Sequence, residues 1–151
     1  MIDIRSDTVT KPSKEMLEHI ITAEVGDDEY KEDPTVNELE EFTASLLGFE
    51  AGLFVTSGLM GNQISLLNHT NPGDEVITTS DSHIQNYEHG AASFLSRIQF
   101  RNVQHKDGNL DLEDLDTQIK KSFYQKPNIS TVAIENLSLI HISEPTRRPK
   151  I

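Results

Sequence analysis

Apolar residues recur at helical spacing in the first fifty positions of the chain. Ser13 can cap a first helix, which Gly26 can close. Asp33 and Pro34 start a second helix, with Asp as the cap and Pro in the first turn, and Gly48 follows its last apolar residue. The apolar faces are expected to bury Met16, Leu17, Ile20 and Ile21 in the first helix and Val36, Leu39, Phe42, Leu46 and Leu47 in the second. Two helices therefore come before the first core strand.

After position 50 the pattern changes to short apolar runs that alternate with amphipathic segments. The runs expected to form strands are 53–56, 75–79, 98–103 and 129–134. The helices expected between them are about 60–69, 84–96 and 111–123, and a turn is expected at 106–109. Alternation of this kind predicts an α/β fold with a parallel sheet and crossover helices.

The acidic composition and the absence of cysteine limit the kinds of ligand and partner that the chain can bind. The 151 residues include 25 Asp and Glu against 13 Lys and Arg, which gives a net charge of −12. Such a field repels nucleic acid and acidic membrane surfaces. Because cysteine is absent, disulfides and thiolate metal sites are excluded. No residue is assigned as a metal ligand, and the sequence does not show whether a cation binds. The amino terminus lacks a secretion signal and no apolar run is long enough to span a bilayer, so a cytoplasmic protein is expected.

The segment LFVTSGLMGN, residues 53–62, leads an apolar run into a Ser57-Gly58 turn that opens a helix. A helix start carries unpartnered N–H groups and partial positive charge, so a phosphate docked there gains hydrogen bonds and a favourable field. Gly58 lets the backbone approach the anion, and the Ser57 hydroxyl adds a donor. An ordinary Ser-capped helix would leave the same pattern. A nucleoside-triphosphate loop is excluded, because no Lys-Ser/Thr pair follows the glycines at the required spacing.

Polar pairs follow three of the expected strands. They are Ser57-Gly58, Ser82-His83 and Glu135-Asn136. In an open parallel sheet, ligands bind at the carboxyl ends of the strands, where helix starts and backbone groups converge. The coincidence of the three pairs predicts a binding site at this edge of the sheet.

His83 is the candidate for acid–base chemistry. It lies in a polar turn just past a strand end, with Tyr87 one helical turn later on the same face. An imidazole there is able to act as a general base near neutral pH or to lie over an aromatic cofactor, and an exposed residue beside a helix cap is the competing interpretation. His89 points elsewhere, so the two do not form an i, i+4 metal pair. The other histidines are expected to be scattered surface residues: His19, His69, His105 and His141.

Two segments near the amino terminus are open to a functional or a plain structural interpretation. Ser6 lies in an extended run of alternating hydroxyls, which could present it to a carboxylate, and an edge strand or arm explains the same run. Tyr30 lies in the acidic loop YKEDP, for which a solvated loop is the default interpretation.

Several motifs in order closely resemble the amino-terminal portion of L-threonine aldolases. They are RSDTVTKP, VGDDEYKEDPTVNELE, LFVTSGLMGNQ, GDEVI, SHIQNYEHGA and the strand that ends in EN. The resemblance covers nearly all of residues 2–136. It implies a pyridoxal 5'-phosphate enzyme of fold type I, the aspartate-aminotransferase-like fold, with residues 1–136 as the amino-terminal part of its major domain. Because this family assembles as dimers of dimers, it also implies a homotetramer.

The resemblance assigns the cofactor site. Ser57, Gly58 and Leu59 would hold the cofactor phosphate, and His83 would stack on the pyridine ring. His83 is also the candidate catalytic base for the substrate's β-hydroxyl. The implied reaction is retro-aldol cleavage of L-threonine or L-allo-threonine to glycine and acetaldehyde, with the cofactor as electron sink.

The resemblance also assigns substrate contacts. Ser6 would help to hold the substrate carboxylate, and Tyr87 would lie near the β-hydroxyl side of the pocket. Tyr30 would reach towards the active site of a neighbouring subunit. The substrate is therefore expected to be a small amino acid.

The chain departs from the family after Asn136. The family's Schiff-base lysine and carboxylate-binding arginines would lie beyond its last residue, so the fragment alone is expected to be inactive. The string LSLIHISEPTRRPKI, residues 137–151, resembles the conceptual translation of a transposase-type sequencing-library adapter and is expected to be a non-native tail. A short strand padded by Leu137, Leu139 and Ile142 is the alternative. The fragment is also expected to aggregate, because missing strands would leave a sheet edge and apolar faces uncovered.

Two other functions stay open at this point. One is a related β-eliminating lyase with the same fold and cofactor, and the other is a non-catalytic pseudo-enzyme or assembly subunit. The motifs RSDTVT and YKEDPT favour the aldolase, and the presence of Ser6, Ser57, Gly58 and His83 argues against a decayed site.

Overall fold

The computed structural model describes residues 3, 7–106, 109–120 and 124–135. The chain divides into two compact units, Met1–Thr56 and Ser57–Ile151. Residues 136–151, which include the expected tail, lie outside the described residues.

The first unit is helical. It contains η1 (Asp7–Val9), α1 (Lys14–Thr22), η2 (Asp28–Tyr30) and α2 (Pro34–Leu47). Ser13 caps α1 by accepting a hydrogen bond from the N–H of Met16, and Asp33 caps α2 in the same way. Gly48 ends α2 in the left-handed conformation with φ of 75°. These caps confirm the expected starts of both helices and the end of the second.

The end of the first helix was expected at Gly26, and this is wrong. The helix α1 stops at Thr22, with Ala23 in an extended conformation. Gly26 serves the following loop instead: its N–H donates to the Asp33 carboxylate at 3.1 Å, and a Cβ built on it would lie 2.1 Å from the Glu32 carbonyl oxygen. The close approach of two backbone segments therefore requires this glycine.

The apolar faces of the first unit are not buried as expected. Ile20 and Ile21 of α1 are 65% and 82% exposed, and Phe42 and Leu46 of α2 are 63% and 69% exposed. Ala44 is the one buried apolar side chain among the described residues of this unit. The two helices have the sequence pattern of elements that need a covering layer, and the described part of this unit does not provide one.

The run 53–56, expected to be the first core strand, forms no strand in the structure. A strand needs a neighbouring strand to accept its N–H groups. Here the N–H of Phe54 donates to the Glu40 carboxylate at 2.7 Å, and the Leu53 side chain is 68% exposed. The segment is therefore tied to α2 by a side chain rather than by a sheet ladder.

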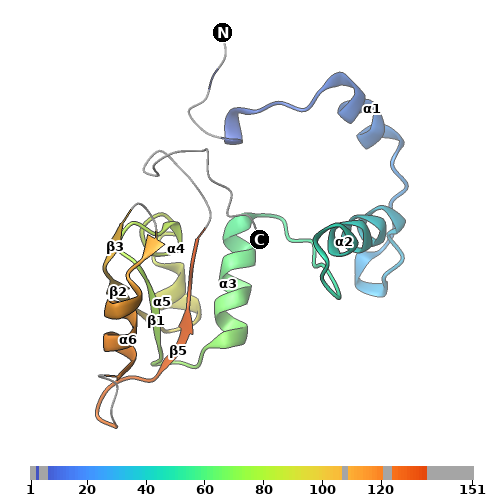
Figure 1. The fold of residues 1–151 in the computed structure, drawn as a ribbon. Helices are drawn as coiled ribbons and strands as arrows, with labels where there is room; N and C mark the ends of the chain where they lie inside the picture. The colour runs from blue at the N-terminus through green and yellow to red at the C-terminus, as the bar shows by residue number, and fades with distance from the viewer. Residues whose placement is uncertain (1–2, 4–6, 107–108, 121–123, 136–151) are drawn as a thin grey trace. The chain divides into compact units, whose positions relative to one another are not determined.

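The second unit is an α/β layer structure (Figure 1). Its sheet is parallel, with strand order β2-β1-β5, formed by β1 (Glu75–Thr79), β2 (Gln99–Val103) and β5 (Ile129–Val132). The helices are α3 (Gly58–His69), α4 (His83–Asn86), α5 (Ala91–Leu95) and α6 (Leu112–Lys120). A small hairpin of β3 (His105–Lys106) and β4 (Asn109–Leu110) flanks the expected turn. The parallel sheet confirms the expected α/β fold.

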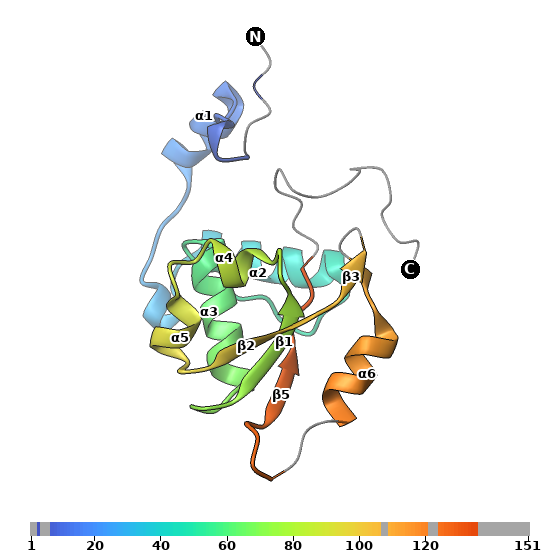
Figure 2. The ribbon, with the colours of Figure 1, turned by 90° about the vertical axis from the view of Figure 1, so that its left-hand side faces the viewer.

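Helices cover both faces of the central strand, and the hydrophobic cluster lies on one of them. Figures 1 and 2 show α3 and α5 on one face of the sheet and α6 on the other. Val76 and Ile77 of β1 are completely buried, which is typical of a central parallel strand. Leu66, Ile84, Ala92 and Ile98 pack with Val76 into one cluster. The cluster fixes α3, α4 and α5 against the strand whose carboxyl end leads to His83.

The helix expected over 84–96 is broken in two. Between α4 and α5, His89 and Gly90 have φ of 54° and 71°, so the backbone turns through left-handed conformations that end a helix. The break lets Glu88 point inward, where its side chain is completely buried. This buried carboxylate lies in the middle of the candidate site.

Candidate functional site

The start of α3 offers an anion site. Ser57 caps the helix, since its Oγ accepts from the N–H of Met60 at 3.1 Å. The N–H groups of Gly58 and Leu59, at the first turn, have no partner among the described residues. A Cβ built on Gly58 would meet no atom within 4 Å, so open space lies beside these donors. Two free N–H groups, a hydroxyl and the helix dipole fit a phosphate group.

His83 begins the short helix α4, directly after the turn that follows β1. Its side chain is 25% exposed, and its Nδ1 lies 3.0 Å from Oε1 of Glu88. The Tyr87 ring lies next to the imidazole, with centroids 5.6 Å apart and planes tilted by 38°. The expected pairing of His83 and Tyr87 on one face is confirmed by this ring contact.

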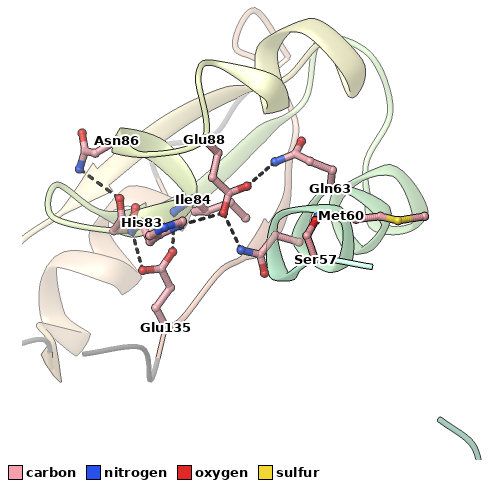
Figure 3. A network of polar contacts seen from close by, with 10 residues as sticks. Ser57, Met60, Gln63, His83, Ile84, Asn86, Glu88 and Glu135 are labelled. Carbon is pink, nitrogen blue, oxygen red and sulfur yellow. Dashed lines mark hydrogen bonds and ion pairs between the residues drawn. The ribbon is translucent and has the colours of Figure 1, made fainter. Parts of the chain in front are cut away.

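Glu88 joins the imidazole to α3. Its Oε1 also accepts from Nδ2 of Asn62 at 2.6 Å, and its Oε2 accepts from Nε2 of Gln63 at 2.7 Å. Figure 3 shows the Glu88 carboxylate between His83 and Gln63. Asn62 lies four residues after Gly58, about one helical turn or roughly 6 Å along the axis. The helix that begins at Gly58 is therefore connected to the imidazole through Glu88.

Glu135 brings the third expected pair into contact with the second. It follows β5, and its carboxylate accepts from the N–H of His83 at 2.6 Å and from the N–H of Ile84 at 2.7 Å (Figure 3). Ser82, the residue at the cap position of α4, makes no side-chain cap hydrogen bond. A carboxylate from a neighbouring strand thus caps the helix that carries the imidazole. Asn136 lies outside the described residues.

The structure does not place two other predicted site residues relative to this group. Ser6 lies outside the described residues. Tyr30 lies in the other unit, at the end of η2, with 72% of its surface exposed.

The expectation for His105 is wrong. Its side chain is only 18% exposed, and its Nε2 lies 3.3 Å from both Ser80 Oγ and Asp81 Oδ2. Because β2 runs parallel to β1, the residue after one strand is placed beside those after the other. His19 and His69 are exposed as expected, and His141 lies outside the described residues.

Sequence reasoning missed Glu88 and its partners on α3. Glutamate is rarely buried, and position 88 lies in a polar segment with no apolar periodicity. The helix break that turns Glu88 inward depends on contacts with α3, which are distant in sequence. Local pattern therefore carries no signal for this residue.

Two features are absent from the described residues. No cluster of three or more His, Asp or Glu side chains there could hold a metal ion. None of the helices in this part of the chain is long and apolar enough to cross a membrane.

Comparison with known proteins gives a family match and several relatives. The family described as beta-eliminating lyase matches residues 3–138. The chain is 40% identical over 137 residues to low specificity L-threonine aldolase of Escherichia coli K12 and 41% identical over 141 residues to low-specificity L-threonine aldolase 1 of Arabidopsis thaliana. It is 38% identical over 138 residues to alanine racemase TOXG of Cochliobolus carbonum.

The matches cover most of this chain and a smaller part of each relative. The three alignments cover 90%, 89% and 89% of the chain, and 41%, 39% and 35% of the respective relatives. The chain therefore spans about two fifths of the length of the two aldolases that it matches.

Proposed function

Because the chain belongs to the beta-eliminating lyase family, we propose that it is the amino-terminal part of a pyridoxal 5'-phosphate-dependent enzyme of fold type I that cleaves L-threonine or L-allo-threonine to glycine and acetaldehyde. The observation that carries the proposal is the contact chain from α3 through Glu88 to His83. It joins an anion cradle to an imidazole at one edge of a parallel sheet, which is where such folds bind ligands. The complete protein, meaning the product of the gene recovered beyond residue 136, is the species expected to be active.

The cradle at α3 fits the phosphate of the cofactor. Ser57, Gly58 and Leu59 would provide a hydroxyl and two backbone donors to its oxygens, with the field of α3 behind them. The absence of a side chain on Gly58 leaves the room that the phosphate needs. These residues would hold the phosphate end of the cofactor.

His83 would contact the pyridine ring of the cofactor. Its imidazole is partly exposed, held by Glu88 at one nitrogen, and able to lie flat on the pyridine ring. When bound, the cofactor supplies the electron sink that stabilises charge on Cα as the Cα–Cβ bond breaks. His83 is also the candidate to take the proton of the substrate's β-hydroxyl. Tyr87, in ring contact with His83, would line the side of the pocket that faces this hydroxyl.

Two further roles rest on the resemblance to the aldolases. Ser6 would help to bind the substrate carboxylate, and Tyr30 would reach the site of a neighbouring subunit in a homotetramer. We expect the complete protein to act in the cytoplasm on a small amino acid, in threonine breakdown and glycine formation. The lysine that binds the cofactor covalently would lie in the part of the protein beyond this chain.

Titration of the complete protein with pyridoxal 5'-phosphate tests the proposal. A new absorbance band that saturates with the cofactor, followed by release of acetaldehyde and glycine from L-threonine, is the expected result. Pyruvate and ammonia as products would indicate the β-eliminating lyase instead. Interconversion of alanine enantiomers would indicate a racemase, and no absorbance change would indicate a pseudo-enzyme.

We also propose that residues 137–151 are not native to this protein. The proposal rests on the likeness of LSLIHISEPTRRPKI to a translated sequencing adapter. Long-read sequencing across the locus is expected to replace this string with family sequence. Recovery of LSLIHISEPTRR in frame would overturn it.

A further inference from the structure

The imidazole of His83 contacts a network of polar side chains around Glu88. Two amide donors, Asn62 Nδ2 and Gln63 Nε2, lie 2.6 and 2.7 Å from one completely buried carboxylate, and His83 Nδ1 lies 3.0 Å from the same group. A buried carboxylate held by two amide donors is compensated as an anion, and an ionised carboxylate only accepts hydrogen bonds. The contact with His83 therefore requires a hydrogen on Nδ1, which leaves the lone pair of the neutral imidazole on Nε2.

The backbone of His83 is held independently of its ring. Glu135 accepts from the N–H groups of His83 and Ile84, while Glu88 accepts from the ring itself. One carboxylate thus fixes where the residue lies, and the other fixes the rotation of the ring and its tautomer. A side chain needed only for packing at position 88 would not require a buried acid with three donors.

We infer that Glu88 is a positioning residue that selects the Nδ1-protonated tautomer of His83 and presents Nε2 as the basic atom of the site. This inference rests on the proposed function, since it assigns the proton-accepting atom in that reaction. Glu88 is completely buried and would act through His83. The competing role is structural: Glu88 only ties the α4–α5 turn to α3.

The first test reads the tautomer directly. In the complete protein labelled with ¹⁵N-histidine, the His83 signals are assigned by their loss in His83→Asn. Magic-angle-spinning ¹⁵N NMR at neutral pH is expected to show protonated Nδ1 and unprotonated Nε2. The opposite assignment in the wild-type protein overturns the inference, whether or not the protein cleaves threonine.

The second test separates a positioning role from a structural one. Glu88→Met keeps a side chain of similar length without any acceptor, and Glu88→Gln keeps one carbonyl oxygen for the Nδ1 hydrogen. We expect Glu88→Met to lower kcat about 10- to 100-fold with KM changed less than about threefold, and Glu88→Gln to lose less. In a His83→Asn background, Glu88→Met is expected to lower kcat less than about twofold further, because the residue it acts through is gone.

A matched control is available on β1. Glu75 is also a buried carboxylate, paired with Arg101, and lies at the amino end of the strand whose carboxyl end leads to His83. Glu75→Met is expected to lower the unfolding midpoint without changing the His83 tautomer. If Glu88→Met behaves like this control, or lowers kcat equally in the wild-type and His83→Asn backgrounds, the role is structural and the inference is wrong.

The two proposals fail in different ways. A wild-type protein that neither binds the cofactor nor cleaves threonine refutes the proposed function, and the ¹⁵N measurement then decides the tautomer alone. If Glu88→Met does not fold, Glu88→Gln and the wild-type tautomer decide the inference.

Discussion

Gly58 separates a functional from a structural explanation of the helix start. An added Cβ meets no protein atom within 4 Å, and its φ is not in the left-handed region. Gly58→Ala is therefore expected to leave stability unchanged or to raise it by up to about 1 kcal/mol, because alanine favours a helix. The same methyl group would occupy phosphate space, so the affinity of the complete protein for pyridoxal 5'-phosphate is expected to fall at least about tenfold, measured by absorbance titration.

Gly48→Ala is the control for that substitution. Gly48 has φ of 75° at the end of α2, so alanine there is expected to lower stability by about 1 kcal/mol. Cofactor affinity is expected to stay the same. Equal cofactor affinity in the wild-type protein and Gly58→Ala would contradict phosphate binding at the start of α3.

Single residues were predictable where their chemistry is local. Ser57 and His83 were identified because a cap and a strand-end histidine are visible in a short window of sequence. Glu88 was not, because its role depends on Asn62 and Gln63, more than twenty positions away. The prediction for His105 was wrong for the same reason, since its partners Ser80 and Asp81 follow a neighbouring strand.

At the scale of elements, α4 depends on a cap from another element. The two carboxylate oxygens of Glu135 each accept from one N–H group of α4. The amide of glutamine has only one oxygen, so it would accept from only one of these N–H groups. Glu135→Gln is expected to lower the free energy of unfolding by about 1–2 kcal/mol, measured by urea denaturation. Glu113→Gln, at the exposed start of α6, is the control and is expected to change it by less than about 0.5 kcal/mol. Equal effects of the two changes would contradict the capping role.

The start of α2 predicts a pH dependence. The N–H groups of Val36 and Gly26 donate to Asp33 and hold the pKa of its carboxyl below the ordinary value of 3.8. A depressed pKa contributes stability that is present above about 3.8 and is lost as the pH falls through the folded-state pKa. Asp33→Asn keeps an oxygen that can cap the helix but loses the contribution to stability that depends on the carboxylate charge.

Urea denaturation from pH 7 to pH 3 measures that contribution. The stability difference between wild-type protein and Asp33→Asn is expected to shrink as the pH falls through the acid end of this range. Glu38→Gln, on the exposed surface of the same helix, is the control. A difference that stays constant with pH would contradict the account of Asp33.

Helices and strands could be predicted where the apolar pattern and the flanking turn residues agree. The strand Glu75–Thr79 was predicted residue for residue, since a short apolar run follows a Pro-Gly-Asp turn. The run 53–56 has a similar pattern but no partner strand among the described residues, so Glu40 accepts the Phe54 N–H instead. Whether an apolar run becomes a strand depends on a neighbour that its own sequence does not specify.

At the scale of the whole molecule, exposed apolar surface predicts association. Ile21 of α1, Leu46 of α2, Phe94 of α5 and Ile134 after β5 are 82%, 69%, 82% and 72% exposed. Monomeric proteins rarely leave so many large apolar side chains uncovered, and β2 and β5 are open sheet edges among the described strands. The 151-residue chain alone is expected to aggregate and to bind a hydrophobic dye, as measured by light scattering and fluorescence.

The complete protein is the control for this prediction. It is expected to stay in solution with less dye bound per chain, because we expect its additional sequence to cover these surfaces. A monomeric 151-residue chain that melts cooperatively would contradict the expectation.

The central claim is that one site joins the start of α3 to His83, and a structure of the complete protein with pyridoxal 5'-phosphate tests it most directly. The account predicts phosphate oxygens about 2.7–3.2 Å from the N–H groups of Gly58 and Leu59, with the His83 imidazole against the pyridine ring. A phosphate bound elsewhere, or a ring that does not contact His83, would contradict it.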